Sequence, residues 1–155
     1  MKKFSLLLAM VLCICMVVPP AFASEQYQTG DMVSVKDFGA KGDGKTDDTA
    51  AITAAIQTVK STYNKGTVFF PAGTYIISKT VPLLSGINIV GVGDGSVIAE
   101  RGLAANTAMM SGTDISDVTV EKMMFVSETG MVTHRAVEAV SSRRIRIQNN
   151  RAIRC

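Results

Sequence analysis

The sequence predicts an all-β solenoid with an α-helix near its N-terminal end. Three short segments share an apolar-polar-apolar strand pattern and begin 31 and then 27 residues apart, at residues 87–89, 118–120 and 145–147. This spacing fits the coils of a solenoid, because the strands of a sandwich recur about every 8 to 12 residues. Each coil has two open faces that only neighbouring coils can cover, so about three repeats are needed for stability.

The N-terminal elements follow one another in a compact order. Apolar side chains at Val33, Val35 and Phe38 predict a short strand. Residues 39–44 then contain three glycines and Asp43, a composition typical of a turn that needs positive φ. The turn leads directly into the expected helix.

The helix is expected over residues 47–61. Thr46 or Asp47 can accept hydrogen bonds from the free backbone N–H groups at its start, and Asp48 favours the positive end of its dipole. Apolar side chains recur on one helical face, which predicts packing against an apolar surface; they are Ile52, Ile56 and Val59, with Ala51 and Ala55 beside them.

Short β-rich segments fill the rest of the chain. Residues 67–70 read as a buried strand, and the turn at residues 71–74 leads into another strand at residues 75–77. Further walls of the coils are expected at residues 97–98, 123–126 and 136–137. Turns rich in Gly, Asn, Asp and Ser separate these segments.

A phosphate-binding motif competes for the same N-terminal turn. Residues 39–46 satisfy the pattern G-x-x-x-x-G-K-[ST] and precede a helix. However, Asp43 would lie inside the cradle, and Asp47 and Asp48 just beyond it, where all three would repel a phosphate. We therefore expect no nucleotide site.

The N-terminal half resembles a known group of proteins. The segment VKDFGAKGDGKTDDTAAI, followed by GTVFFPAGTYIIS, is similar to the N-terminal part of the pectate lyase superfamily, which has polygalacturonase-like, rhamnogalacturonase-like and epimerase-like members. The resemblance implies a right-handed, single-stranded parallel β-helix whose N-terminal end is capped by the helix. It does not imply a reaction, because hydrolases, lyases, epimerases and noncatalytic spikes share this scaffold.

The first 23 residues have the features of an export signal. Lys2 and Lys3 precede an uncharged apolar run, and small residues favour cleavage between Ala23 and Ser24. The mature chain, residues 24–155, then carries 14 Lys and Arg against 13 Asp and Glu. A secreted product is expected, in the cell envelope or outside it, and bulk charge gives no support for nucleic acid as a partner.

Arg144 and Arg146 are the candidate substrate-binding residues. Alternation places Ile145 and Ile147 inside the solenoid and the two arginines together on its outer face. Guanidinium groups match carboxylates, so a uronate-containing polysaccharide is a natural partner under the resemblance. The simpler alternative is a solvated strand whose charges discourage edge pairing.

Other polar residues give weaker hypotheses. Asp114 and Asp117 have a spacing that could serve a calcium ligand or acid pair, but such spacing more often caps a turn. His134 is expected to be an ordinary surface or turn histidine. No catalytic residue, cofactor or metal ligand is assigned, and calcium is expected only if the protein acts as a lyase.

Two functional hypotheses therefore stay open. The first is a secreted protein that acts on acidic, pectin-like glycans by glycosidic hydrolysis or β-elimination. The second is a noncatalytic carbohydrate-binding or surface-spike β-helix. Because strand-like sequence continues to Cys155, we expect this chain to be the N-terminal part of a longer β-helix and to be inactive by itself.

Overall fold

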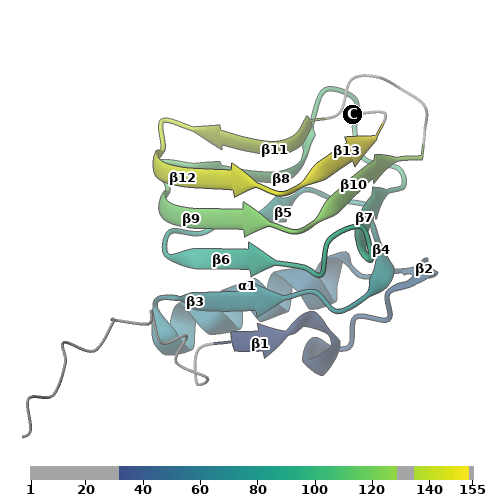
Figure 1. Ribbon diagram of the computed structural model, residues 1–155, viewed down its shortest axis with the longest axis horizontal. Helices are drawn as coiled ribbons and strands as arrows, with labels where there is room; N and C mark the ends of the chain where they lie inside the picture. The colour runs from purple at the N-terminus through teal and green to yellow at the C-terminus, as the bar shows by residue number, and fades with distance from the viewer. Residues whose placement is uncertain (1–31, 129–134, 154–155) are drawn as a thin grey trace, which may run out of the picture.

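The computed structural model describes residues 32–128 and 135–153, which form a stack of parallel strands (Figure 1). The expected export signal and His134 lie outside the described residues. The elements, in chain order, are β1 Met32–Ser34, the 3₁₀ helix η1 Val35–Phe38, β2 Asp43–Asp47, α1 Thr49–Tyr63, β3 Gly66–Phe69, β4 Gly73–Ile77, β5 Val81–Pro82, β6 Ile87–Val90, β7 Ser96–Glu100, β8 Ala108–Thr113, β9 Ser116–Glu121, β10 Met124–Ser127, β11 Arg135–Val140, β12 Arg143–Gln148 and β13 Arg151–Ile153.

The strands form three parallel sheets. The first sheet has the order β1-β3-β6-β9-β12, the second β2-β4-β7-β10-β13, and the third β5-β8-β11. Consecutive strands along the chain belong to different sheets, so the chain visits each wall in turn and then starts a new layer. The prediction of an all-β fold built from parallel coils is confirmed.

The register between coils agrees with the repeat spacing. Ile89 pairs with Val120, and Val120 with Ile147, in the first sheet. On the second sheet Ile98 pairs with Phe125. In parallel strands, paired residues point to the same face, so these apolar side chains are stacked in columns.

The columns fill the interior of the stack. Val68, Ile89 and Val120 are fully buried in the first sheet, and Tyr75 and Ile98 are fully buried in the second. Burying a side chain of this kind contributes about 1.5 to 3 kcal/mol, so the repeated columns are the main source of stability.

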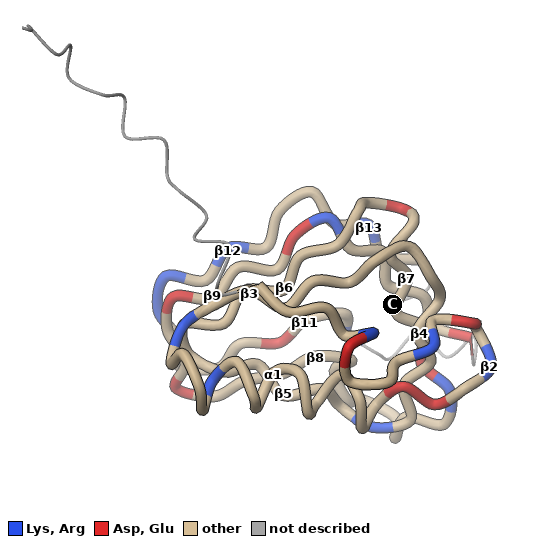
Figure 2. Tube along the Cα trace, turned by 90° about the horizontal axis from the view of Figure 1, so that it is seen from below, with Lys and Arg blue, Asp and Glu red and all other residues tan. Residues whose placement is uncertain are grey.

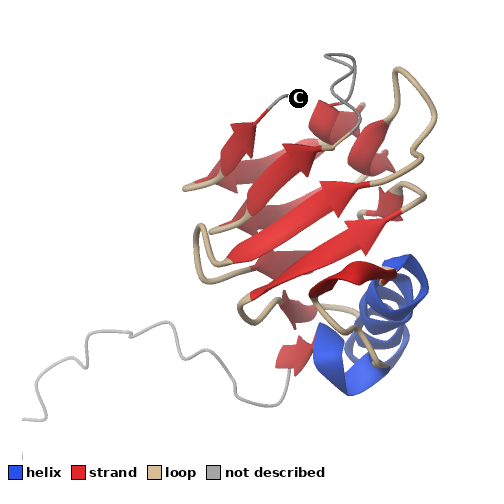
Figure 3. Cartoon of the chain, turned by 90° about the vertical axis from the view of Figure 1, so that its right-hand side faces the viewer, coloured by secondary structure: helices blue, strands red, loops and turns tan. Residues whose placement is uncertain are grey.

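Helix α1 packs at the end of the stack that contains β1 and β3, as Figure 3 shows. Its buried residues are Thr49, Ile52, Ala55, Ile56 and Val59, which form the apolar face predicted from the sequence. This face contacts η1, β1, β3, β5 and β6. The helix lies two residues further along the chain than expected at each end. Within the described part of the chain, no helix has the length and apolar character needed to cross a membrane.

The predicted strand at Val33, Val35 and Phe38 is shorter than expected. The chain leaves the extended conformation at Val35, because the Ser34 hydroxyl accepts from the Lys36 N–H and the Asp37 carboxylate accepts from the Ser34 N–H. These reciprocal bonds start a 3₁₀ turn instead of a longer strand. The prediction for the helix start is confirmed, because Asp47, one of the two residues expected to accept there, accepts from the Thr49 N–H at 2.9 Å.

The N-terminal turn is held by carboxylates from its own chain. The Asp48 side chain is 1% exposed and accepts from the Lys41 and Gly42 N–H groups at 2.7 and 3.0 Å. Asp43 Oδ1 accepts from the Lys45 N–H at 2.9 Å and from the Thr46 N–H. The amides that would hold a phosphate in a nucleotide-binding loop are thus already used, which is the physical reason the motif gives a different structure here.

Candidate functional site

The outer face of the first sheet brings polar side chains into one row. On β6, β9 and β12 the inward residues alternate with Asn88, Thr119 and Arg146. Thr119 pairs in register with Arg146, and the Thr119 N–H donates to Asn88 Oδ1 at 3.0 Å. The row therefore crosses three successive coils and ends at a guanidinium.

Arg146 is the group in this row that is available to a ligand. It is exposed on β12, and among the described residues its guanidinium has no hydrogen-bond or ion-pair partner. Figure 2 shows that basic positions gather along β12. An exposed guanidinium without a protein partner can use all five of its N–H donors for a carboxylate or for sugar hydroxyl groups.

Arg144 has a different environment, although the sequence placed it beside Arg146. Its Nη2 donates to Asp117 Oδ2 at 2.7 Å, and its Nε donates to Asp117 Oδ1. The hydrogen bond from Arg144 is the main cause that lowers the pKa of Asp117 to about 2, and the charge of Lys65 adds to it. Arg144 is therefore paired with Asp117, whereas Arg146 has no side-chain partner in the part of the chain that the structure describes.

The pairing depends on an unusual backbone. Asp117 has φ 58° and Arg144 has φ 53°, and both residues lie in the left-handed region within strands of the first sheet. Sequence reasoning missed this pair and considered Asp117 with Asp114. The 27-residue separation of Asp117 and Arg144 equals the repeat of the coils, and this was the signal that could have found the contact.

Ile147 also differs from the simple inside-outside pattern. It lies above Val120 in register, yet its side chain is 52% exposed. Ile145, one alternation earlier, is half-buried and packs against the core. The direction of these side chains agrees with the prediction, but no described coil covers Ile147.

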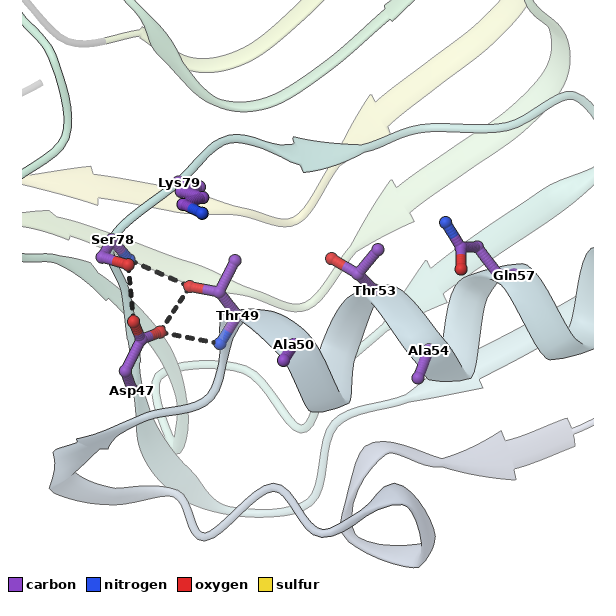
Figure 4. Close-up of a pocket in the computed structure, with 8 residues that line it drawn as sticks. All are labelled: Asp47, Thr49, Ala50, Thr53, Ala54, Gln57, Ser78 and Lys79. Atoms are coloured by element: carbon purple, nitrogen blue, oxygen red, sulfur yellow. Dashed lines mark hydrogen bonds between the residues drawn. The ribbon is translucent and has the colours of Figure 1, made fainter.

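A hollow with a volume of about 480 Å³ lies beside α1 (Figure 4). Its most polar corner is Asp47, which accepts from the Thr49 N–H at 2.9 Å and from Ser78 Oγ at 2.5 Å. Burial raises the pKa of Asp47, but the hydrogen bonds from Ser78 and Thr49 outweigh it and leave the pKa below its ordinary value. This carboxylate joins α1 to the end of β4, so its role here is structural.

No metal-binding site is found among the described residues. The residues that the structure describes contain no group of three or more His, Cys, Asp or Glu side chains arranged to hold a metal ion.

The fold and sequence together define the family. The chain belongs to the rhamnogalacturonase A/epimerase, pectate lyase-like family, whose sequence model matches residues 32–153. The resemblance found in the N-terminal half is thus confirmed over both described segments.

Individual relatives cover several activities. The chain is 46% identical to alginate lyase 7 of Azotobacter vinelandii over 72 residues, which is 42% of this chain and 8% of that protein. It is 35% identical to the tail spike protein of Shigella phage Sf6 over 100 residues, which is 61% of this chain and 16% of the spike. The chain thus spans only a small part of these relatives.

A solved structure shows the same architecture. The A-module of the mannuronan C-5 epimerase AlgE4 from Azotobacter vinelandii matches with a TM-score of 0.61 and 25% identity, over 77% of this chain and 37% of the module. The parallel β-helix class is therefore shared with a protein whose name describes action on a polysaccharide.

Proposed function

We propose that this chain is part of a secreted, polysaccharide-active protein that binds an acidic glycan along the outer face of the first sheet. The observation that carries this proposal is the guanidinium of Arg146, which lies at the end of the polar row through Asn88 and Thr119 and has no partner within residues 32–128 and 135–153. A uronate carboxylate can accept two parallel hydrogen bonds from a guanidinium. The neighbouring hydroxyl and amide groups suit the hydroxyl groups of a sugar.

The relatives support the choice of an acidic polymer. Alginate and mannuronan, which the names of two matched proteins contain, are polymers of uronic acids. Under this proposal the full-length protein cleaves its glycan by hydrolysis or by β-elimination. The described residues carry the binding face, and the isolated chain is expected to release neither reducing ends nor unsaturated uronides from pectic polymers.

Binding can be tested with the purified chain and two single substitutions. Arg146→Gln should weaken binding to alginate or polygalacturonate roughly tenfold, because a hydrogen bond to a charged group contributes about 1.5 to 3 kcal/mol. Arg135→Gln, on the third sheet, removes the same charge from another wall and serves as the control. Isothermal titration with each polymer, and with neutral dextran, measures both effects.

The result separates a site from bulk charge. We expect the Arg135 variant to bind the acidic polymers as tightly as the unchanged protein does. Dextran should not bind to the unchanged protein or to either variant. Equal weakening by the two substitutions would show that only net charge attracts the polymer, and the proposed face would be wrong.

The second candidate function is a noncatalytic spike or carbohydrate-binding β-helix. The likeness to the Sf6 tail spike over 61% of this chain favours it. The assay for reducing ends and unsaturated uronides, applied to a longer natural form of the protein if one is isolated, distinguishes the two candidates. If the protein binds the polysaccharide but releases neither reducing ends nor unsaturated uronides, the noncatalytic candidate is favoured.

We also propose that α1 is the N-terminal cap of a right-handed β-helix and that export removes residues 1–23. The buried face of α1 and its contacts with the first strands support a cap. The charged and apolar pattern before Ala23 supports export. N-terminal sequencing of the protein recovered outside the cell should begin at Ser24.

A further inference from the structure

A second column of side chains lies beside the polar row on the outer face of the first sheet. From β3 to β12 (Figure 1), the column consists of Phe69, Val90, Glu121 and Gln148, which pair in register from coil to coil. Val90, Glu121 and Gln148 each follow a residue of the polar row by two positions. Side chains two residues apart on a strand point to the same side, so the column and the row share one face.

Glu121 places a carboxylate in the middle of this face. Its neighbours in the column are both described, because Val90 lies in the preceding coil and Gln148 in the following one. Glu121 Oε2 accepts from Gln148 Nε2 at 2.8 Å, and within residues 32–128 and 135–153 no Lys or Arg forms an ion pair with Glu121. The partly buried carboxylate therefore keeps acceptor capacity for donors from outside the protein.

Glu121 and Arg146 occupy diagonal positions on neighbouring strands. Thr119 is in register with Arg146 and precedes Glu121 by two residues, so the Cα atoms of Glu121 and Arg146 lie about 8 Å apart. When Arg146 holds a uronate, the adjoining sugar along the strand direction lies opposite Glu121. If that sugar is also a uronate, its carboxylate faces the carboxylate of Glu121, and the two like charges repel each other.

A neutral sugar suits the position opposite Glu121 better. Its hydroxyl groups can donate to Glu121 and can accept from the amide of Gln148. Its C–H groups can contact Phe69 and Val90, which are partly buried on the same face. Apolar surface with a few well-placed polar groups is the usual composition of a ligand site.

We propose that Glu121 is a specificity-determining residue, which favours a glycan in which a neutral sugar adjoins the uronate held by Arg146 and disfavours a polymer of uronates alone. This inference rests on the proposed function, because it requires a glycan on the outer face of the first sheet. The selection acts through repulsion of the wrong glycan as well as through contacts with the right one.

Two acidic glycans with different sugar order provide the probes. Polygalacturonate consists of uronates alone, whereas each glucuronate of hyaluronan adjoins a neutral N-acetylglucosamine. Isothermal titration with oligosaccharides of equal uronate number gives their affinities for the unchanged chain, Glu121→Gln and Glu121→Lys. Glu138→Gln, on β11 of the third sheet, removes the same charge from another wall and is the control.

We expect Glu121→Gln to bind polygalacturonate about fivefold more tightly than the unchanged chain does, because the repulsion is gone. Its affinity for hyaluronan should not increase. Glu121→Lys should bind polygalacturonate more tightly still, and both gains should shrink at high salt. Glu138→Gln should leave the ratio of the two affinities unchanged. Circular dichroism checks that the variants are folded.

The inference is overturned if Glu121→Gln leaves the ratio of the two affinities unchanged, or if Glu138→Gln changes it equally. It is also overturned if the unchanged chain binds polygalacturonate but not hyaluronan. Arg146→Gln separates this failure from failure of the proposed function. If Arg146→Gln weakens binding while Glu121→Gln has no selective effect, only the selectivity is wrong. If neither glycan binds, or Arg146→Gln weakens neither, the proposed face and this inference are both wrong.

Discussion

Gly42 shows how a single position sets the N-terminal turn. It has φ 62°, and a Cβ placed on it would lie 2.9 Å from Cε1 of Tyr75. The Tyr75 ring is fully buried, and its hydroxyl donates to the Pro71 carbonyl at 2.8 Å, so the ring cannot move away easily. Burial, together with the charge of Asp48, raises the pKa of Tyr75 to about 12, which keeps this donor protonated.

We predict that Gly42→Ala lowers the free energy of unfolding by about 3 kcal/mol, because strain at positive φ and overpacking against Tyr75 add together. Gly93→Ala is the matched control, with φ 85° and nothing within 4 Å of the added Cβ. The control should lose only about 1 to 2 kcal/mol from backbone strain. Urea unfolding measures both values, and equal losses would contradict a clash with Tyr75.

The glycines of this turn could be predicted from the sequence, but their partners could not. The need for positive φ follows from three glycines in six residues, and all three have it. The Asp48 carboxylate, however, was expected to act at the helix start, whereas it turns back to Lys41 and Gly42. That choice depends on where β2 and α1 meet, which local sequence does not specify.

At the scale of elements, α1 was the most predictable part of the fold. Its 3.6-residue apolar pattern identified the buried face, and Ile52, Ile56 and Val59 are fully buried. By contrast, β2 was not predicted, because four of the five residues in its sequence Asp-Gly-Lys-Thr-Asp are depleted in strands. It is extended because Asp43 pairs with Thr74 and Asp47 pairs with Ile76 of β4. These partners are distant in the sequence, so the local sequence does not predict the strand.

We predict that Ile56→Ala lowers the free energy of unfolding by about 2 to 5 kcal/mol, because it leaves a cavity between α1 and the first strands. Gln57→Ala, on the exposed side of the same turn, should change it by less than about 0.5 kcal/mol. Thermal and urea unfolding followed by circular dichroism tests this. If the two substitutions cost the same, helix propensity and not docking governs the stability of α1.

For the whole molecule, the repeat spacing predicted which segments lie above one another. The positions of Ile89, Val120 and Ile147 were correct because an inward residue must recur once per coil. The separate environments of Arg144 and Arg146 were not predictable in the same way. They depend on the left-handed backbone conformation of Arg144, which brings the Arg144 guanidinium to Asp117 in the preceding coil.

Acidic side chains in different coils give the whole molecule a common response to pH. Hydrogen bonds from Thr46, then Lys45, lower the pKa of Asp43 to about 2, from an ordinary value of 3.8. The hydrogen bond from Arg144 has the same effect on Asp117. Since the folded-state values lie below the unfolded ones, the stabilisation is complete above about pH 4 and is lost as pH falls towards 2.

We therefore predict that the urea midpoint of the unchanged protein falls between about pH 4 and pH 2, because the unfolded chain binds more protons in this range. Asp43→Asn and Asp117→Asn each remove one titrating group, so each should make this fall shallower. Asp94→Asn is the control, because Asp94 accepts one hydrogen bond, from Arg151 at 3.1 Å, whereas Asp43 and Asp117 each accept at least two. Parallel curves for all four proteins would mean that groups other than Asp43 and Asp117 cause acid unfolding.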